Sequence, residues 1–542
     1  MGARNARLGE IAEDTFGWRE LRPGQREAME ELLAGHDVLV VSPTGSGKSA
    51  VYQVPAQLLP GPTLVVSPLI ALQRDQAAGL RDVDAGGAVT VDSAQPEGRS
   101  EESMEDFRTG DAEFLFLSPE QLAKPEVVDE VARARPSLVA VDEAHCVSAW
   151  GHDFRPDYLA LGRAIDRLGH PPVAALTATA APPVRDDIVR ALGLRDVRQI
   201  VRGFDRPNLW LEVRRFLDAE DKRRALVEDA AGRDGLGLVY VATRRDAEEY
   251  AGRLRDAGRR AEAYHAGMKA AERRRVHRLF REGDVDTVVA TSAFGMGIDK
   301  PDVRYVLHAA PPESPDAYYQ EIGRGGRDGE PAAAVLFYRP EDLGLRRFFG
   351  GGRPDEETLG RVAEAVHGHD GPLRRAALRD AVAVSPARLT RAVNLLARVG
   401  AVEVLGRGDV RYAADGPAPE RAVTEAVELD EARRGVERSR LEMMRAYAEH
   451  TGCRRRFLLE YFGEPYEQAC GYCDNDRDGT EPEEDPGDGP FPLHAKVVHA
   501  EWGEGVVMRR DPDRVTVLFD EAGYRVLSLE AVERDGLLTL RG

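Results

Sequence analysis

The sequence is poor in cysteine and aromatic residues and contains no long apolar run. Four cysteines in 542 residues are too few for a disulfide scaffold. No apolar stretch approaches the roughly 20 residues of a membrane-spanning helix. The first ten residues, MGARNARLGE, lack the apolar core of a secretory signal. These absences exclude the secreted, disulfide-rich and membrane-spanning classes, so we expect a soluble cytoplasmic protein with no membrane partner.

The charge balance is acidic, with a net charge of −20, and 42% of the residues are apolar. This length and apolar content predict three to five domains, because one domain usually holds about 100–200 residues. An acidic average argues only weakly against a nucleic-acid partner, since phosphates are bound by a local basic groove. The Pro- and Gly-rich segment 478–492 is strongly acidic, and we interpret it as an acidic disordered linker.

Short β-branched runs alternate with helical stretches through about the first 340 residues. Each run is followed by Ser, Thr, Pro, Gly or Asp, which is typical of parallel strands buried on both faces and joined by helices. The runs are Val38–Val41, Leu64–Val66, Phe114–Leu117, Leu138–Val141, Val173–Leu176, Leu238–Val241, Val288–Ala290 and Tyr305–Leu307. The pattern predicts two α/β lobes, residues 1–206 and 207–342, separated near Gly203–Asn208, where turn residues gather.

The pattern changes after residue 342. Segment 343–428 predicts helices followed by two short strands, which favours a winged-helix-like domain; a plain helical domain with a β-flap is the alternative. Residues 429–477 predict a helical subdomain that ends in clustered cysteines. Segment 493–542 alternates with period two, which favours a small β-barrel.

A glycine-rich loop between a strand and a helix, Ser42–Ser49 (SPTGSGKS), carries the strongest chemical signal. Glycines let backbone N–H groups curl around phosphates, and the following helix N-terminus adds positive potential. Lys48 would reach the β- and γ-phosphates, and the Ser49 hydroxyl would coordinate Mg²⁺. Position 42 is not the Gly of the plain phosphate-loop motif, so the bends are expected at the two glycines. The predicted nucleotide-binding residues are Thr44, Gly45, Ser46, Gly47, Lys48 and Ser49.

Two carboxylates follow the apolar run 138–141, in the segment Asp142-Glu143-Ala144-His145. Asp142 would hold Mg²⁺, and Glu143 would orient the attacking water as a general base. His145 is interpreted as coupling the nucleotide to the second lobe, with a polar filler as the alternative. The pair gains meaning from its position at a strand end, downstream of the phosphate loop.

Aromatic and basic residues gather directly after this pair, at Trp150, His152, Phe154 and Arg155. Bases stack on aromatic rings while basic groups follow the phosphates, so this segment predicts contact with nucleic acid. A hydrophobic plug between helices is the alternative.

The second lobe contributes the segment 320–329, QEIGRGGRDG. Arg324 and Arg327 are three residues apart, which predicts one helical face. An arginine that reaches across to a γ-phosphate stabilises transition-state charge, so closure of the lobes would gate hydrolysis. The alternative for each arginine is a surface ion pair.

Taken together, the segments LRPGQ, PTGSGKS, SPLIALQRDQ, DEAH, LTATA, FGMGIDKPDVRYVLH and QEIGRGGRDG resemble the RecQ helicases of superfamily 2. They cover residues 16–342 in the right order. The resemblance implies two RecA-like lobes and ATP-dependent 3′-to-5′ unwinding of DNA in repair or recombination. Its DNA substrates would be single strands and tailed or forked duplexes, so we expect the protein at the nucleoid.

The resemblance also assigns roles to individual residues. Gln25 would read adenine with Arg22 beside it, and Arg327 would be the arginine finger. Gln320 and Arg324 would lie next to that finger. The loop that couples DNA to ATP hydrolysis would contain Trp150, Phe154 and Arg155.

The segment that begins at Cys453 resembles the family's zinc subdomain, in which four cysteines bind the metal. Cys453, Cys470 and Cys473 fit that pattern, but the fourth position is Asp476. A carboxylate oxygen is an acceptable zinc ligand, so a Cys₃Asp site is expected. A subdomain that has lost its metal and folds by packing alone is the alternative.

Two departures from the family keep other functions open. The winged-helix-like segment precedes the zinc subdomain, whereas it follows that subdomain in typical members. The tail resembles the Tudor-like C-terminal domain of UvrD and PcrA helicases, which implies a protein partner; a plain stabilising barrel is the alternative. An ATP-driven DNA translocase or remodeller with weak unwinding, and an ATP-gated DNA-binding platform that recruits partners, are therefore the competing functions. RNA unwinding agrees less well with the aromatic loop.

Overall fold

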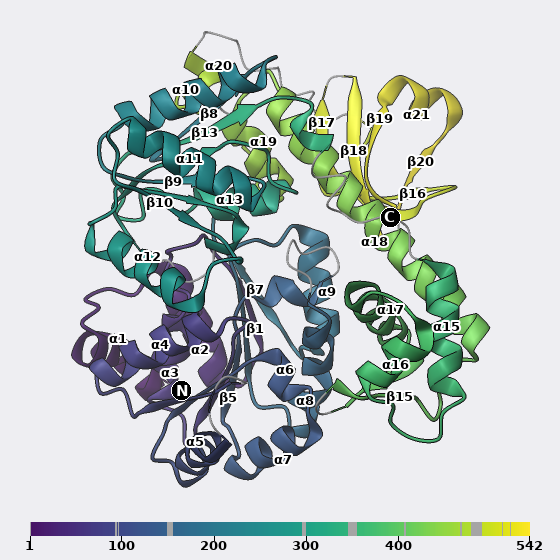
Figure 1. Cartoon of the computed structure of the whole chain (residues 1–542). Helices are drawn as coiled ribbons and strands as arrows, with labels where there is room; N and C mark the ends of the chain where they lie inside the picture. The colour runs from purple at the N-terminus through teal and green to yellow at the C-terminus, as the bar shows by residue number, and fades with distance from the viewer. Residues whose placement is uncertain are drawn as a thin grey trace.

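The computed structural model describes residues 2–92, 95, 97–148, 155–294, 300–344, 355–405, 408–466, 469–477, 490–511, 513–520 and 522–541. Two α/β lobes stack on each other, and a helical region and a yellow C-terminal sheet stand beside them (Figure 1). Within these ranges, no helix is both long enough and apolar enough to cross a membrane. The predicted acidic linker falls on residues 478–489, which lie outside the described ranges, and on the three residues that follow them.

The first lobe is built on a seven-stranded parallel sheet in the order β3-β4-β2-β5-β6-β1-β7. Its strands are β1 (Val38–Val41), β2 (Thr63–Val66), β3 (Ala88–Val91), β4 (Phe114–Leu117), β5 (Leu138–Val141), β6 (Val173–Thr177) and β7 (Arg198–Val201). Its helices are α1 (Gly2–Phe16), α2 (Pro23–Ala34), α3 (Ala50–Ala56), α4 (Ile70–Asp82), α5 (Glu97–Thr109), α6 (Pro119–Leu122), α7 (Pro125–Ala134), α8 (Leu161–Arg167) and α9 (Pro182–Leu192), with short 3₁₀ turns at Ala144–Val147 and Pro156–Ala160.

The second lobe has a six-stranded parallel sheet in the order β10-β11-β9-β12-β13-β8. Its strands are β8 (Leu209–Arg215), β9 (Leu236–Tyr240), β10 (Ala261–Tyr264), β11 (Thr287–Ala290), β12 (Val303–His308) and β13 (Ala332–Tyr338). Its helices are α10 (Ala219–Gly232), α11 (Arg244–Asp256), α12 (Ala270–Glu282) and α13 (Pro315–Ile322), with a 3₁₀ turn at Ser292–Phe294. Every apolar run predicted as a strand overlaps one of these strands, so the two-lobe prediction is confirmed.

The region after the lobes joins three helices and a hairpin to one long helix. Helices α15 (Glu356–His367), α16 (Arg375–Val382) and α17 (Pro386–Arg398) precede the antiparallel pair β14 (Val402–Val404) and β15 (Val410–Tyr412). Ser385 caps α17, because its side chain accepts a hydrogen bond from the backbone N–H of Arg388. This is the helix–turn–helix and hairpin arrangement that the sequence predicted.

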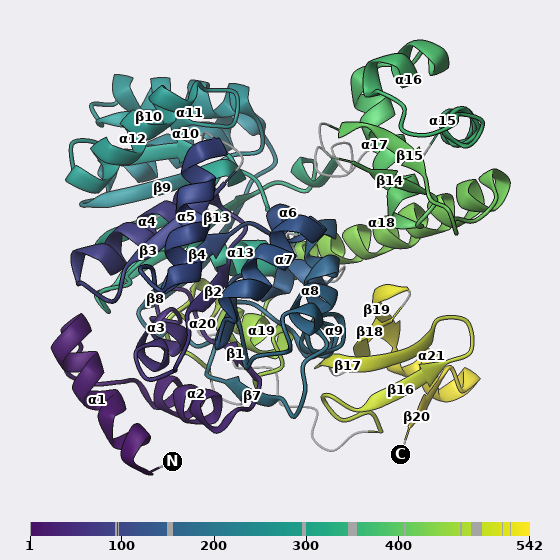
Figure 2. The ribbon, with the colours of Figure 1, turned by 90° about the horizontal axis from the view of Figure 1, so that it is seen from below.

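The long helix α18 (Pro419–Glu449) has 31 residues and leads through α19 (Arg454–Tyr461) to the short α20 (Asp474–Arg477). The domain boundary expected between residues 428 and 429 falls inside α18, so the helical region and the cysteine segment share one continuous element. Seen from below, α18 runs from the winged-helix-like part toward the C-terminal sheet (Figure 2).

The C-terminal sheet is antiparallel, in the order β19-β18-β17-β16-β20. Its elements are β16 (Lys496–His499), β17 (Gly503–Asp511), β18 (Arg514–Phe519), β19 (Gly523–Ser528), α21 (Leu529–Asp535) and β20 (Leu538–Leu540). Among the described residues, no pairing joins β19 to β20, so closure into a barrel stays a prediction. Met508, Leu518 and Tyr524 share one apolar core with residues of α18, α19 and the first lobe.

Candidate active site and metal centre

A cavity of about 560 Å³ lies between the two lobes. The first lobe lines it with the phosphate loop, α4 and the Asp142–Glu143 pair, and the second lobe lines it with α12, Lys300 and the segment that holds Gln320, Arg324 and Arg327. The structure therefore brings the predicted nucleotide-binding and catalytic residues of both lobes to one place.

The phosphate loop connects β1 to α3 and bends at Gly45 and Gly47, whose φ angles are +79° and +75°. These left-handed angles favour glycine, as expected from the sequence. The Lys48 ammonium donates to the backbone oxygens of Ser42 (3.0 Å) and Pro43 (3.2 Å). Burial lowers the pKa of Lys48, and the carboxylates of Glu143 and Asp142 oppose that effect.

Two hydroxyl groups of the same loop are buried without a hydrogen-bond partner among the described residues, namely Thr44 Oγ1 and Ser46 Oγ. Buried polar groups are normally satisfied, so an unsatisfied pair in a loop that lines a cavity fits a site for a polar ligand. A phosphate group offers the acceptor oxygens that these hydroxyls and the loop N–H groups require.

Gln25 and Arg22 lie directly on the phosphate loop. The Gln25 amide nitrogen donates to the backbone oxygens of Ser46 (3.0 Å) and Gly47 (2.9 Å). The Arg22 guanidinium donates to the backbone oxygen of Gly45 (3.2 Å). Both residues are therefore next to the expected nucleotide, and adenine reading by Gln25 stays a prediction.

Asp142 and Glu143 follow β5 and face Lys48 and Ser49. Burial, and then the charge of Glu143, raise the pKa of Asp142 to about 7. The Gln76 amide approaches the Ser49 hydroxyl at 3.5 Å and also hydrogen-bonds the Asp142 side chain. Ser49 and Asp142 therefore lie near each other in the lining of the cavity. Hydroxyl and carboxylate oxygens are suitable ligands for Mg²⁺, and the residues present fit that ion.

His145 joins the catalytic carboxylate to the end of β6. Its Nδ1 atom is 2.9 Å from Thr177 Oγ1 and 3.3 Å from Glu143 Oε2. Thr177 belongs to the segment LTATA, so these contacts of His145 lie within the first lobe. Coupling of His145 to the second lobe stays a prediction.

The segment that carries Arg324 and Arg327 is not helical, which corrects the prediction of one helical face. Helix α13 ends at Ile322, and residues 323–330 form a series of turns. The reason is the glycine content of GRGGRDG, because glycine is costly inside a helix and Gly326 adopts a φ of +57°.

Two residues that the sequence did not single out hold these turns in place. The Arg206 guanidinium donates to the backbone oxygens of Gly323 (3.1 Å) and Gly325 (2.7 Å). The Asn208 amide donates to those of Gly326 and Glu330, both at 2.8 Å. The only available signal was that polar Arg and Asn lie within GFDRPN, the segment taken as the break between lobes.

Arg324 and Arg327 differ in their surroundings. Arg324 is 4% exposed and lies beside Tyr240, whose pKa burial raises to about 12. Arg327 is half-buried and packs against the phosphate loop, because a β-carbon added to Gly45 would lie 3.2 Å from its Cγ atom. Arg327 therefore has the position expected of an arginine finger.

The predicted DNA-contacting segment is described only at its end. Trp150, His152 and Phe154 lie outside the described residues. The Arg155 guanidinium donates to the backbone oxygen of Pro68 (3.0 Å), and its backbone N–H bonds to that of Cys146 (2.9 Å). Arg155 is thus fixed close to the DEAH segment.

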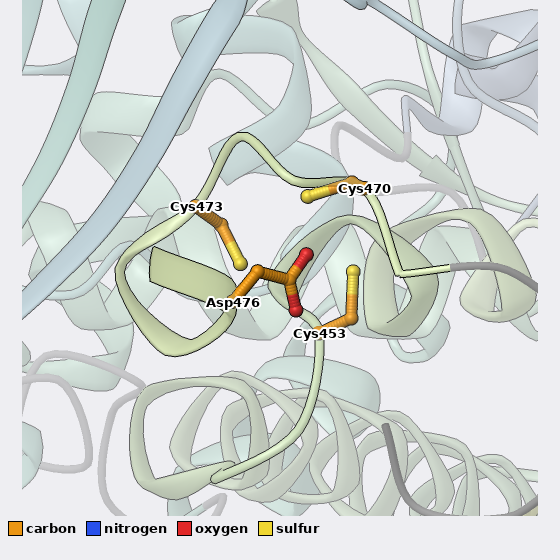
Figure 3. A group of neighbouring side chains, drawn as sticks. All are labelled: Cys453, Cys470, Cys473 and Asp476. Atoms are coloured by element: carbon orange, nitrogen blue, oxygen red, sulfur yellow. The ribbon is translucent and has the colours of Figure 1, made fainter. Parts of the chain in front are cut away.

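The three predicted cysteines and Asp476 come together around α19 and α20 (Figure 3). One ligand atom from each of Cys453, Cys470, Cys473 and Asp476 lies within 4.8 Å of the others. Hydrogen bonds from the thiols of Cys470 and Cys473 lower the pKa of Cys453 well below its usual value. Thiolates and a carboxylate at this separation fit zinc.

The metal centre is fastened to the second lobe. Cys473 forms a β-bridge with Leu211 of β8. The neighbouring Asp474 accepts a hydrogen bond from Arg454 (2.8 Å) and another from the backbone N–H of Val213 (3.0 Å). Zinc binding would therefore stabilise the contact between this subdomain and the motor, because metal binding adds to folding free energy.

Comparison with protein families matches three parts of the chain. They are a DEAD/DEAH box helicase domain at residues 22–188, a helicase conserved C-terminal domain at 221–329 and a RecQ zinc-binding domain at 415–477. The probable ATP-dependent DNA helicase RecS of Bacillus subtilis is 33% identical over 465 residues, which cover 84% of this chain and 90% of RecS. The chain belongs to the RecQ family of superfamily 2 helicases.

Other RecQ-family relatives are longer. The ATP-dependent DNA helicase RecQ of Pasteurella multocida is 42% identical and covers 61% of this chain, and that of Haemophilus influenzae is 40% identical and covers 61%. This chain spans 52% of the Pasteurella protein and 53% of the Haemophilus protein, about half of each relative's length. The match to RecS extends beyond the two lobes.

Solved structures of more distant helicases share the fold. Helicase Lhr of Mycobacterium smegmatis, bound to single-stranded DNA and AMP-PNP, has a TM-score of 0.50 and 22% identity, covering 79% of this chain and 62% of Lhr. The helicase MrfA bound to DNA has a TM-score of 0.53 and 17% identity, covering 76% of this chain and 60% of MrfA. At these identities, the likeness concerns the fold alone.

Proposed function

We propose that this RecQ-family helicase couples ATP hydrolysis to 3′-to-5′ translocation on single-stranded DNA and to unwinding of tailed or forked duplexes. The observation that carries the proposal is the cavity between the lobes. There the phosphate loop, the Asp142–Glu143 pair and Arg327 face one another. A DNA-binding platform needs no efficient hydrolysis, so a complete catalytic set supports a motor.

The chain's residues divide the work of hydrolysis. Lys48 and the loop N–H groups bind the β- and γ-phosphates, and Glu143 orients the attacking water. Mg²⁺, when held by Ser49 and Asp142, neutralises charge on the phosphate oxygens. Arg327 approaches from the second lobe and stabilises the charge of the transition state. Hydrolysis therefore requires the two lobes to be closed, which links it to lobe movement.

The helix–turn–helix part supports contact with duplex DNA. Its segment from 372 to 398 contains six arginines and one acidic residue, although the whole chain has a net charge of −20. These arginines are Arg374, Arg375, Arg379, Arg388, Arg391 and Arg398. Arg379, Arg388 and Arg391 are paired with Asp380, Asp355 and Asp430. Arg374 and Arg375 would therefore carry most of the contact with duplex phosphates. We propose that this part holds the duplex while the lobes pull one strand.

Two further proposals concern a protein partner and the place in the cell where the protein acts. The C-terminal sheet would offer its outer face to a protein partner, as its resemblance to the Tudor-like tails of UvrD and PcrA implies. The protein would act in the cytoplasm, at the nucleoid, in DNA repair or recombination.

The test is strand displacement on two partial duplexes, one with a 3′ and one with a 5′ single-stranded tail, in ATP and Mg²⁺. We expect release from the 3′-tailed duplex only and none with Lys48→Ala. Lys269→Ala, an exposed lysine on the second lobe, is the matched control and should behave as wild type. Release from the 5′-tailed duplex alone would overturn the polarity. No release from either duplex, with DNA-stimulated ATP hydrolysis intact, would favour the translocase or remodeller.

A further inference from the structure

The C-terminal sheet is connected to the arginine-bearing segment by two tyrosines and one buried carboxylate. Tyr524 of β19 stacks on Tyr461 of α19, with ring centroids 5.4 Å apart and planes 24° from parallel. The Tyr461 hydroxyl donates a hydrogen bond to the carboxylate of Asp316. All three side chains are at least 94% buried, with exposures of 6%, 3% and 3% respectively. Asp316 lies in α13, the helix that carries Gln320 and ends at Ile322, two residues before Arg324.

The chemistry of this contact makes it specific. Burial and the Asp316 carboxylate raise the pKa of Tyr461 well above its usual value. The hydroxyl therefore keeps its proton and remains a donor. A buried carboxylate is costly unless it is hydrogen-bonded, so loss of this donor would favour movement of α13.

The sheet is held closely enough to transmit a displacement. Gly523, with a φ of +76°, lies against α18, and a β-carbon there would be 2.4 Å from the Ser439 hydroxyl. The sheet also contacts α19, where the guanidinium of Arg509 in β17 lies 4.5 Å from the centre of the Phe457 ring. Packed interiors pass on strain because they have few voids.

We propose that the C-terminal sheet takes part in ATP hydrolysis. Tyr524 and Tyr461 are positioning residues: they fix the position of α13, and with it the positions of Arg324 and Arg327 at the nucleotide site. The proposal rests on the proposed function. It also gives the sheet a second use, because a partner that displaces the sheet changes the rate of ATP hydrolysis without touching the nucleotide.

The experiment measures kcat and KM for ATP with an oligothymidylate as single-stranded DNA, on the full chain. The variants are Tyr461→Phe, which removes the donor to Asp316, and Tyr524→Leu, which removes the stacked ring. The matched control is Tyr338→Phe, because the Tyr338 hydroxyl also joins the second lobe to α18, at Glu449 (2.8 Å), without touching α13.

We expect both variants to lower kcat about five- to ten-fold, an effect of the size of one typical hydrogen bond, with KM for ATP changed less than about two-fold. Tyr338→Phe should keep the wild-type kcat. The double variant should be no slower than Tyr461→Phe alone, because both changes act through Asp316.

A fall in thermal stability with unchanged kcat, measured well below the unfolding temperature, would mean that the tyrosines only stabilise the fold and would overturn the proposal. Multiplying effects in the double variant would overturn the shared route through Asp316. Failure of the ATP-driven motor is distinguishable, since the wild-type chain would then show no DNA-stimulated hydrolysis at all. Failure of unwinding alone is also distinguishable, since strand displacement would be lost while the kcat comparison between wild type and variants remained measurable.

Discussion

Arg327 of the second lobe packs against Gly45 of the first, with its Cγ atom 3.2 Å from the place that a β-carbon on Gly45 would occupy. The two residues come from the two Gly-rich segments that the sequence assigned to opposite sides of the nucleotide. Their contact depends on lobe closure, because the two residues belong to different lobes. Arg206 and Asn208, in the connection between the lobes, hold the turns on which Arg327 lies.

Replacement of the arginine finger should slow hydrolysis more than it weakens ATP binding. Arg327→Ala is expected to lower kcat about 1,000-fold with little change in KM, because the guanidinium acts on transition-state charge. Steady-state ATP hydrolysis with single-stranded DNA measures both constants. Arg278→Ala, on an exposed part of α12, is the control. A KM effect as large as the kcat effect would show that Arg327 only binds ground-state ATP.

The fourth zinc ligand can be tested by substitution in both directions. Asp476→Ala should reduce the bound zinc of the purified protein, because three thiolates leave the tetrahedral site open. Asp476→Cys should keep one zinc per chain, since it restores the four-cysteine pattern of the family. Elemental analysis after gel filtration gives the ratio. Full zinc occupancy in Asp476→Ala would exclude the carboxylate as a ligand.

A buried carboxylate fastens α17 to α18, and its loss should loosen the winged-helix-like part. The Asp430 side chain is 1% exposed and lies 3.1 Å from Arg391 and 2.8 Å from Arg434. Asp430→Ala leaves these guanidinium groups without their shared partner. It should lower the free energy of unfolding by about 2–3 kcal/mol and no more, since the arginines are themselves partly in water. Hydrogen exchange should rise in α17 and the first half of α18 while the lobes stay protected. Uniform exchange across the chain would contradict a local anchor.

The stability of the first lobe should fall as the pH rises through the range 4.5–7. Burial raises the pKa of Glu113, beside Thr63, from 4.5 to about 7. Between these values, the folded state binds more protons than the unfolded state, so folding is favoured at the acidic end and loses stability toward pH 7. Glu113→Gln should raise the free energy of unfolding by about 1 kcal/mol at pH 8 and make it depend less on pH between 4.5 and 7.

Denaturant unfolding between pH 5 and pH 8 provides the measurement for this change. Glu130→Gln, at an exposed position of α7, is the control and should leave the profile unchanged. An identical slope for wild type and Glu113→Gln would assign the pH dependence to other groups.

The amino-acid sequence was enough to predict the fold class, the two lobes, the phosphate loop, the carboxylate pair that follows β5 and the cysteine cluster. Each of these features depends on residues that are close together in the sequence. Buried parallel strands are short β-branched runs, and a phosphate loop needs glycines at fixed spacing. The prediction was incomplete where the local pattern was weak. Strand β13 begins with three alanines, and β10 and β7 are only half-apolar, so their pairing with neighbouring strands decided their conformation.

How separate segments meet depended on the three-dimensional packing. It placed Arg206 and Asn208 behind the turns that follow α13, and brought Cys453 to Cys470, Cys473 and Asp476. It also set Tyr524 of the tail against Tyr461 and Asp316 of the motor. These contacts join residues far apart in the chain, and the contact between Tyr524 and Tyr461 depends on burial in a common core. Such burial leaves no periodicity in any one segment, so no local pattern of residues specifies it.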